Sequence, residues 1–537
     1  MKRISLYYIV ILLLSAPLVR AQDRYMIFFT DKDNSTFDVN RPTEFLSQRA
    51  LDRRTKNGID VNEFDLPVNQ NYVEAIEALG VATYFKTKWM NGVLAQMTDQ
   101  KATEVQSLEF VASVELVAPG ILLSDDPSET PLTNSLSADD TTDDLTANQN
   151  QMIGVDVMHE EGNRGEGVLI GVFDNGFRNF KQIPAFNHLL TEDRLVMTRD
   201  FSTGAIQVEN FGTHGTRVLS VLAAELESYQ GVASDANYVL FVTEADNEYR
   251  VEEYNWLFAA ELADSLGVDI INSSLGYTTF DDPAMSYAPS DMDGATTVIS
   301  RSAQMAADRG ILVVSSAGNL GGFNWQIVAA PADVPDVLSI GAVTSASILA
   351  SFSSIGPNAN NDMKPDVVAL GSSTAVVSTS GMVAFQNGTS FSAPLVAGLA
   401  AGLLNKNPDL SRVELADAIR GSSSLHDDPN NQYGYGIPNY SLALPLITSI
   451  DEVAQADVYI YPNPISAGDL HVVLSDRYAT QLQELSLFNL QGPQLLKTNL
   501  KPVEGILKVN VDNLIPGLYF LRIKSEQGQV VKKIFIQ

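Results

Sequence analysis

The chain of 537 residues contains no cysteine. Disulfide bonds, thiolate catalysis, cysteine–zinc sites and lipid attachment through an N-terminal cysteine are therefore excluded, and stability must come from the size of the core. Histidine is scarce as well. Any mechanism that needs an imidazole must use one of five residues, which are His159, His188, His214, His426 and His471.

Basic residues are few relative to acidic ones. Lys and Arg number 34 against 65 Asp and Glu, which gives a formal net charge of −31. A field of this sign repels the phosphates of nucleic acids, so we expect no nucleic-acid partner. The 45% of hydrophobic and 18% of charged residues are otherwise typical of a folded globular protein.

Long apolar runs are absent after the first twenty residues. Lys2 and Arg3 precede an apolar run over residues 4–14, and a small-residue site ends at Ala21. This layout is typical of a secretory signal peptide, here over residues 1–21. A membrane anchor or a buried helix is the weaker interpretation, because the run is too short to span a bilayer comfortably.

The length exceeds what one hydrophobic core supports, so we expect several domains. Residues 22–118 form a small α+β module, with strands at Tyr25–Phe29, Gly92–Met97 and Val114–Val117 and helices around Val73–Leu79 and Lys101–Leu108. Aspartate pairs set among Ser, Thr and Pro indicate an acidic linker over 119–148. Whether that linker is a processing site or a passive spacer stays open.

The largest block is expected over 149–446. Its strands are apolar throughout, at Val168–Phe173, Tyr238–Val242, Asp269–Asn272 and Ile311–Val314, and helices at Val218–Leu226, Glu252–Leu266 and Thr297–Arg309 alternate with them. Such strands are buried on both faces, which predicts an α/β domain with a parallel sheet and helices on both faces. After a linker at 447–456, short alternating strands over 457–537 predict a small antiparallel β-sandwich.

Four polar residues stand at the ends of these predicted elements. Asp174 follows a strand, Asn319 follows another, His214 begins a helix between Gly212 and Gly215, and Ser390 precedes a helix with Pro394 in its first turn. Each has an ordinary interpretation. Asp174 and Asn319 fit turns, Ser390 fits a helix cap, and a lone histidine is more often structural than catalytic.

Taken together, the four residues indicate nucleophilic hydrolysis. Their order along the chain is Asp–His–Ser, whereas α/β-hydrolases have Ser–Asp–His. Ser392 rather than glycine stands two residues after Ser390, so the flanks do not fit the nucleophile elbow of that fold either. An amide at Asn319 is suited to donate to the oxyanion of a tetrahedral intermediate.

The surrounding motifs resemble those of the subtilase family. They are Val168–Asp174, His214–Thr216, Ser274–Gly276, Ala317–Asn319 and Gly388–Pro394, with further matches at Ala350–Ser354 and Lys364–Asp366. The resemblance implies Ser390 as the nucleophile, His214 as general base and then acid, Asp174 as its orienting partner and Asn319 as the oxyanion donor. It implies that substrate is bound by Ser274, Leu275, Gly276, Ala317, Gly318 and Ala329.

Two positions depart from the family pattern. Arg217 stands where a second histidine is common, outside the implied triad. Ala329 stands at the floor of the specificity pocket, where glycine is commoner, and its methyl group is expected to shorten the pocket. The preferred substrate side chain is therefore left open.

The flanking modules fit the same resemblance. The segment 22–118 is similar to subtilase propeptides, which template folding and then inhibit. The segment 457–537 is similar to Bacteroidetes type IX sorting domains, on the motifs Tyr461–Pro464, Gly517–Tyr519 and Lys532–Ile534. Together they imply a zymogen that reaches the cell surface or the medium through the outer membrane, with the propeptide as inhibitor and the type IX machinery as partner.

The implied activity is that of a serine endopeptidase acting on proteins or peptides, as a monomer and without a required cofactor. Structural calcium is compatible with the family, but no site can be placed, since Asp291–Gly294 lacks the spacing of a calcium loop. Two alternatives stay open. One is a catalytically silent adhesin on a protease scaffold, and the other is a secreted esterase.

Overall fold

The computed structural model describes residues 22–120, 135–136, 144–209, 212–245 and 247–448, and in the C-terminal part 458–465, 468–474, 483–489, 494–502, 506–512, 514–525 and 528–537. The chain divides into two units, Met1–Ile447 and Thr448–Gln537, which are described separately. The predicted signal peptide over 1–21 lies outside the described residues, as do most of the acidic linker over 119–148 and most of the linker over 447–456.

The first unit begins with an α+β module. Its elements are β1 (Asp23–Phe29), α1 (Gln48–Lys56), α2 (Gln70–Glu77), β2 (Ala82–Thr87), β3 (Gly92–Met97), α3 (Asp99–Gln106) and β4 (Val111–Ala118). The strands form one sheet in the order β2-β3-β1-β4, with β1 antiparallel to both β3 and β4. Ile27, Val73 and Val93 are fully buried in its core. The three predicted strands and two predicted helices are confirmed, whereas α1 was not predicted.

A parallel sheet of seven strands forms the centre of the first unit. In the order β14-β13-β12-β11-β6-β10-β7 it contains β6 (Leu169–Asp174), β7 (Leu195–Asp200), β10 (Asn237–Val242), β11 (Ile270–Ser273), β12 (Leu312–Ser316), β13 (Leu338–Val343) and β14 (Val367–Leu370). Every pair of neighbours is parallel. The carboxyl ends of all these strands therefore lie at one edge of the sheet.

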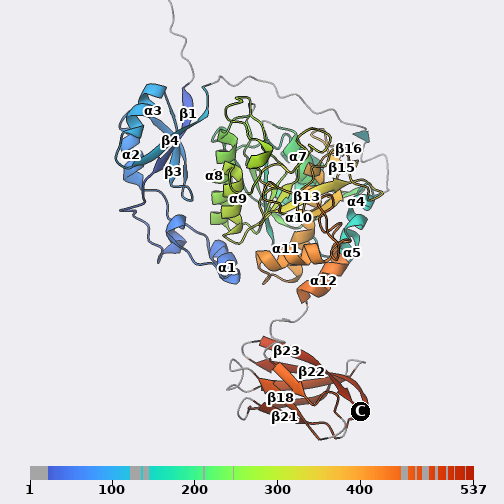
Figure 1. Ribbon diagram of the computed structural model, residues 1–537. Helices are drawn as coiled ribbons and strands as arrows, with labels where there is room; N and C mark the ends of the chain where they lie inside the picture. The colour runs from blue at the N-terminus through green and yellow to red at the C-terminus, as the bar shows by residue number, and fades with distance from the viewer. Residues whose placement is uncertain are drawn as a thin grey trace, which may run out of the picture. The chain divides into compact units, whose positions relative to one another are not determined.

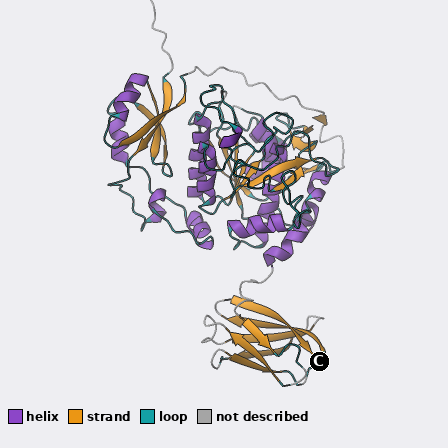
Figure 2. Cartoon of the chain, in the orientation of Figure 1, coloured by secondary structure: helices purple, strands orange, loops and turns teal. Residues whose placement is uncertain are grey.

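Helices cover both faces of this sheet (Figure 1, Figure 2). The helices of this block are α4 (Ala147–Met152), α5 (Val155–Glu160), α6 (Asn187–Thr191), α7 (His214–Ala223), α8 (Val251–Leu266), α9 (Val298–Ala307), α10 (Thr389–Lys406), α11 (Arg412–Gly421) and α12 (Tyr440–Thr448). Successive residues of β6 alternate between two cores. Val172 packs in the core of α7 and α10, and Phe173 packs in the core of α8 and α9. The predicted α/β architecture is confirmed.

One predicted helix boundary is wrong, and one segment predicted as a linker contains a short strand. The helix predicted over Val218–Leu226 is α7, which ends at Ala223 because Ala224 is extended and β8 (Glu225–Leu226) pairs with β9 (Tyr229–Gln230). The acidic linker predicted over 119–148 also contains regular structure. Within it, β5 (Ser135–Leu136) pairs antiparallel with β16 (Val383–Gln386), which in turn pairs with β15 (Thr374–Val377).

The second unit consists of two antiparallel sheets. One has the order β17-β18-β21 and the other β20-β19-β22-β23, from β17 (Val458–Tyr461), β18 (Asp469–Leu474), β19 (Gln483–Asn489), β20 (Gln494–Leu500), β21 (Ile506–Asn510), β22 (Gly517–Ser525) and β23 (Gly528–Ile536). Leu470 and Val509 of one sheet share a core with Leu485, Leu521 and Ile534 of the other. This is the predicted sandwich.

Candidate active site

The candidate residues gather at the carboxyl edge of the parallel sheet. Asp174 is the last residue of β6. Ser274 directly follows β11, and Ala317 directly follows β12. The three strands are neighbours in the order β12-β11-β6, so their carboxyl ends are adjacent. Open α/β sheets bind their ligands at this edge.

A hydrogen bond joins Asp174 to His214. The Asp174 carboxylate is completely buried, and its Oδ1 accepts from His214 Nδ1 and from the backbone N–H of Asn175, both at 2.8 Å. The first turn of α7 comes this close because residue 215 is glycine. A Cβ there would lie 2.4 Å from the carbonyl oxygen of Gly176. With Nδ1–H donating to Asp174, Nε2 of His214 is left as a proton acceptor.

Ser390 lies in the first turn of α10 and is 8% exposed. The prediction that Pro394 occupies this first turn is wrong, because α10 begins at Thr389 and Pro394 is inside the helix. Proline has no N–H to bond the carbonyl four residues earlier, which is that of Ser390. This carbonyl instead accepts from Ser274 Oγ at 2.8 Å, and the helix start is thereby joined to the segment after β11.

The structure shows no hydrogen bond between the Ser390 hydroxyl and the His214 imidazole. Within the described part of the chain, Ser390 Oγ donates to the carbonyl oxygen of Ser274 at 3.3 Å. The ring of the next residue, Phe391, lies 5.7 Å from the His214 ring between centroids. Catalytic hydrogen bonds are often loose before substrate binds, and rotation about χ1 of Ser390 redirects its hydroxyl.

Asn319 is held by the start of the same helix. Its Oδ1 accepts from the backbone N–H of Thr389 at 2.9 Å and from Thr389 Oγ1 at 3.1 Å. Because a backbone N–H can only donate, the amide oxygen must face Thr389 and Nδ2 must face away. Nδ2 lies 3.7 Å from the position a Cβ would take on Gly388. The Nδ2 of Asn319 and the backbone N–H of Ser390 are thus donors at the start of α10 that are suited to meet an oxyanion.

Three of the predicted substrate-binding residues meet around one methyl group. The Cβ of Ala329 lies 3.0 Å from where a Cβ on Gly276 would be, and 3.4 Å from the same point on Gly318. The backbone N–H of Ala329 donates to the carbonyl of Ala317 at 3.0 Å. Leu275, in the same segment as Gly276, is partly buried against the core of α8 and α9. The Ala329 methyl therefore occupies the space between the segments after β11 and β12.

Two residues near the site were not predicted. Thr389 orients Asn319, and the sequence signal for it was only its place beside Ser390. Glu244, just after β10, accepts a hydrogen bond from the hydroxyl of Tyr277. Burial raises the pKa of Glu244 to about 8, with further contributions from Glu248 and Asp174. A glutamate after a strand carries no local signal of such an environment.

Other features of the described chain lie away from these residues. No group of three or more His, Asp or Glu side chains in the described ranges is arranged to hold a metal ion. No described helix has the length and apolar character needed to cross a membrane.

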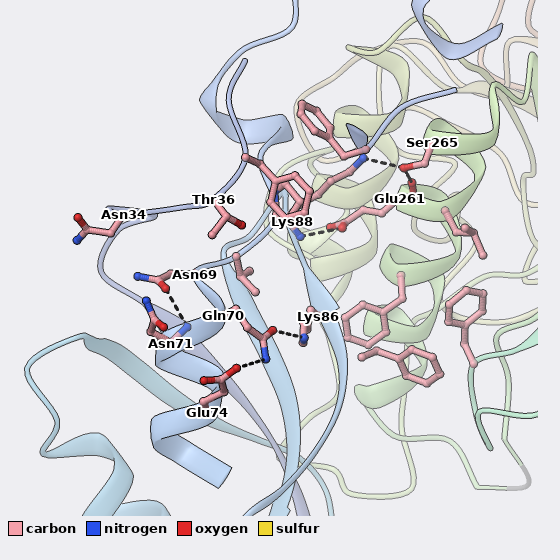
Figure 3. A pocket seen from close by; sticks show the side chains of 18 of the residues that line it. Asn34, Thr36, Asn69, Gln70, Asn71, Glu74, Lys86, Lys88, Glu261 and Ser265 are labelled. Carbon is pink, nitrogen blue, oxygen red and sulfur yellow. Dashed lines mark hydrogen bonds between the residues drawn. The ribbon is translucent and has the colours of Figure 1, made fainter. Parts of the chain in front are cut away.

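A cavity of about 830 Å³ lies between the N-terminal module and α8, lined by Lys88, Glu261 and Ser265 among others (Figure 3). It includes none of the candidate catalytic residues.

Three family models match successive parts of the chain. The model described as "Subtilase family" matches residues 165–436, just over half of the chain. The model "Peptidase S8 propeptide domain, Bacteroidota" matches residues 24–129. The model "Secretion system C-terminal sorting domain" matches residues 459–537. The propeptide match covers the α+β module, the subtilase match covers most of the α/β block, and the sorting-domain match covers the sandwich.

Individual relatives match the α/β block. Subtilisin DY from Bacillus licheniformis is 30% identical over 295 residues, which cover 54% of this chain and 96% of the relative. A subtilisin from Bacillus pumilus is 28% identical over 289 residues, 53% of this chain and 94% of the relative. Among solved structures, the prenylagaramide maturation protease PagA is 22% identical with a TM-score of 0.45, and the alignment covers 55% of this chain and 98% of that one.

Proposed function

Because the chain belongs to the subtilase family of serine peptidases and carries a propeptide domain and a type IX sorting domain, we propose that it is a secreted serine endopeptidase, made as a zymogen, whose triad is Asp174, His214 and Ser390. The observation that carries the proposal is the 2.8 Å bond between buried Asp174 and His214 Nδ1, at the sheet edge where α10 presents Ser390. Protein export to the cell surface or the medium follows from the sorting domain.

In the proposed reaction, Ser390 Oγ attacks the carbonyl carbon of the scissile peptide bond while His214 Nε2 takes the hydroxyl proton. Asp174 stabilises the imidazolium that forms, through the bond to Nδ1. The negative charge on the former carbonyl oxygen is met by the Ser390 N–H and Asn319 Nδ2. His214 then gives its proton to the leaving amine. Water, activated by the same imidazole, hydrolyses the acyl-enzyme and releases Ser390.

Substrate binding is proposed at the segments after β11 and β12. Ser274, Leu275 and Gly276 pair with an extended substrate backbone as an edge strand would. Ala317, Gly318 and Ala329 enclose the side chain before the scissile bond. The Ala329 methyl lies between Gly276 and Gly318, which form the two walls of this pocket. We therefore expect the pocket to prefer shorter side chains than a pocket with glycine at this position would. No metal or organic cofactor has a step in this chemistry, and calcium is left as a possible structural ligand without a site.

The proposal is tested with Ser390→Ala and a matched serine in the same helix. Ser392 Oγ donates to the Thr389 carbonyl at 3.0 Å and is buried, so Ser392→Ala removes a similar hydroxyl without touching the triad. We expect Ser390→Ala to lower casein hydrolysis by about 10⁶-fold, the loss known for the nucleophile of subtilisin itself, and Ser392→Ala to keep it within about tenfold.

A fluorophosphonate probe and an ester substrate separate the alternatives. Labelling of the processed protein that disappears in Ser390→Ala supports the nucleophile, whereas absence of labelling in the unaltered protein would favour a silent binding protein. Hydrolysis of esters without hydrolysis of casein would favour an esterase. Near-normal casein hydrolysis by Ser390→Ala would remove the triad assignment.

A further inference from the structure

Helix α1 of the propeptide contacts the α/β block at the amino ends of its strands. Arg49 donates to the carbonyl of Gly167 at 2.8 Å, two residues before β6 begins, and to the carbonyl of Gly267 at 3.0 Å. It also pairs with Asp269, the residue before β11. In a parallel sheet these positions lie at the edge opposite to Asp174 and Ser274. Six residues of β6 separate the two edges, about 20 Å at the rise of a strand.

The guanidinium group of Arg53 lies against the carboxyl ends of α8 and α9. It donates to the carbonyl oxygens of Val268 at 2.6 Å and Arg309 at 3.1 Å, just past these helices, and to the Asp264 carboxylate at 2.5 Å. The last carbonyls of a helix lack intrahelical partners and form the negative end of its dipole, so a cation is favoured there. Arg53 is 3% exposed, so this contact is shielded from solvent.

Arg54 completes the contact from the next position of α1. It bonds both oxygens of Asp264, at 3.0 and 2.9 Å, and both oxygens of Asp65 within the propeptide, at 2.8 and 3.0 Å. A planar guanidinium can make such two-sided contacts, whereas an ammonium cannot. In the described part of the chain, every side chain that forms an ion pair with Asp264 comes from the propeptide, the third being Lys88 at 3.1 Å.

The fit between α1 and the α/β block extends to the backbone. Gly267 ends α8 in the left-handed conformation, at φ 86°, and a Cβ on it would lie 2.7 Å from the Cβ of Arg49. Gly310, after α9, has φ 82°, and the same atom on it would lie 2.7 Å from Asn57. In return Arg309 of the α/β block bonds Asp65 at 3.2 Å and stacks on Trp89 at 4.5 Å. Among the described residues, Asp264 of the α/β block and Arg53 of the propeptide are thus buried charges whose ion-pair partners all lie on the other side of this contact.

We propose that Asp264 and the carboxyl ends of α8 and α9 form an arginine-binding site of the peptidase block, separate from the substrate cleft, and that the adjacent Arg53 and Arg54 of α1 are its ligand. A helix with two neighbouring guanidinium groups is the chemical class that this site takes. Because α1 lies at the edge away from Ser390, it does not cover the cleft. Its effect is to keep the propeptide attached after the linker is cut, and this consequence rests on the proposed peptidase function.

The binding part is tested in the full chain with Ser390→Ala, so that no self-cleavage occurs. A recognition sequence for a site-specific protease is inserted between residues 121 and 134, the protein is cut and held by its C-terminus, and release of the propeptide is followed over time. We expect Arg53→Gln with Arg54→Gln to speed release by about a hundredfold or more, because buried Asp264 loses both guanidinium partners and keeps only Lys88 among its ion-pair partners in the described residues. Arg54→Lys should speed release of the propeptide at least tenfold, since the positive charge remains but the paired N–H donors of the planar guanidinium group are lost.

Arg41 provides the matched control. It pairs with Glu44 on the propeptide surface, with 55% and 37% of the two side chains exposed, so Arg41→Gln removes one arginine charge outside the site, by the same substitution. Its release rate should stay within about threefold of the unaltered protein. Equal release rates for Arg41→Gln and for Arg53→Gln with Arg54→Gln would overturn the proposal.

A second measurement needs no substitution in α1. In the cut protein, hydrogen exchange of residues 48–56 should be as slow as that of β1, and rapid exchange of 48–56 with β1 still protected would also overturn the proposal. In the active chain, Arg53→Gln with Arg54→Gln should shorten the interval between linker cleavage and peptidase activity, with the final kcat/KM unchanged. An unaltered protein that never becomes active would contradict the proposed function, while the release experiment would still report on the arginine site.

Discussion

Single residues of the candidate site are defined by the atoms that their neighbours already occupy. Asn319 has its amide oxygen engaged by Thr389, and Ser390 has its carbonyl engaged by Ser274 Oγ. Among the described residues, these bonds leave the amide Nδ2 and the imidazole Nε2 available to meet a substrate, while the serine hydroxyl must give up its 3.3 Å bond to the Ser274 carbonyl. The same feature allows the contribution of each residue to be tested one atom at a time.

Asn319→Ala removes a donor whose main contact forms in the transition state. We expect kcat to fall by about a hundredfold to a thousandfold with little change in KM, as when subtilisin itself loses its oxyanion donor. Steady-state kinetics on a peptide substrate measure both constants. Thr389→Ser serves as the control, because it keeps the hydroxyl and N–H that orient Asn319. A change in KM alone would instead make Asn319 a residue that positions the substrate.

Ala329→Gly removes the methyl group between Gly276 and Gly318. The pocket should become deeper, so kcat/KM for substrates with a large aromatic side chain before the scissile bond should rise relative to those with a small one, by about tenfold for the one methyl group removed. A series of peptides that differ only at this side chain measures the ratio. An unchanged ratio would mean that the methyl group does not limit the pocket.

The identity of the candidate residues could be predicted from the sequence, but their bonding could not. Asp174 and Asn319 follow apolar runs that are recognisable as strands, and His214 begins a recognisable helix, so their places at one sheet edge follow from topology. That Pro394 leaves the Ser390 carbonyl free for Ser274 depends on where α10 begins, which the sequence misplaced. Glu244 and Tyr277 are brought together by the fold alone, since 33 residues separate them.

At the scale of elements, the sequence predicted the helices and strands whose apolar residues are buried within one domain. The strands β6, β10, β11 and β12 of the central sheet and the helices α8 and α9 belong to this class. Helix α1 does not, because its residues include three arginines and a lysine and few apolar side chains. Its helical state is stabilised by contacts with residues more than 200 positions away, such as Asp264. The spacing of apolar residues within α1 therefore does not reveal these contacts.

The carboxyl group of Asp264 makes the stability gained from the α1 contact depend on pH. Burial alone would raise the pKa of its carboxyl, but Lys88, Arg53, Arg54 and Arg309 outweigh burial and lower the pKa to about 2. A carboxyl with a lowered pKa in the folded state stabilises that state above its unfolded value of 3.8 and loses this contribution as the pH falls towards 2. Between about pH 5 and 2, the uncut protein should therefore lose about 2 kcal/mol of its free energy of unfolding through this group.

Unfolding of the Ser390→Ala protein by urea at several pH values measures this loss. Asp264→Asn lacks the titrating group, so its free energy of unfolding should fall less steeply below pH 5 although it is lower at pH 7. Asp417→Asn is the control, because this aspartate is 66% exposed where it pairs with Arg420. Parallel pH curves for Asp264→Asn and the unaltered protein would show that Asp264 does not hold a lowered pKa.

At the scale of the whole molecule, the order of the parts places activity and export in different units. The second unit has its own core, in which Leu470, Leu485 and Leu521 are fully buried. The candidate catalytic residues all belong to the first unit. Helix α12 also belongs to the peptidase block, since Ile447 is 4% exposed in the core of α7 and α10 and its carbonyl accepts from Asn407 at 2.8 Å. A chain that ends at Thr448 therefore keeps all the residues of that core.

A chain that ends at Thr448 should hydrolyse peptides as the full chain does, within about twofold once both are processed, because the sandwich contributes none of the candidate catalytic residues. It should not reach the medium, because the sorting domain that matches residues 459–537 is missing. Activity and protein amount in the medium and the periplasm of a type IX-competent host measure the two effects separately. Normal release of the shortened chain would contradict the sorting role. A soluble, processed and inactive shortened chain would instead mean that the sandwich supports the peptidase block. The full-length Ser390→Ala chain, which keeps the sandwich, should be released into the medium without activity, which separates export from catalysis in one molecule.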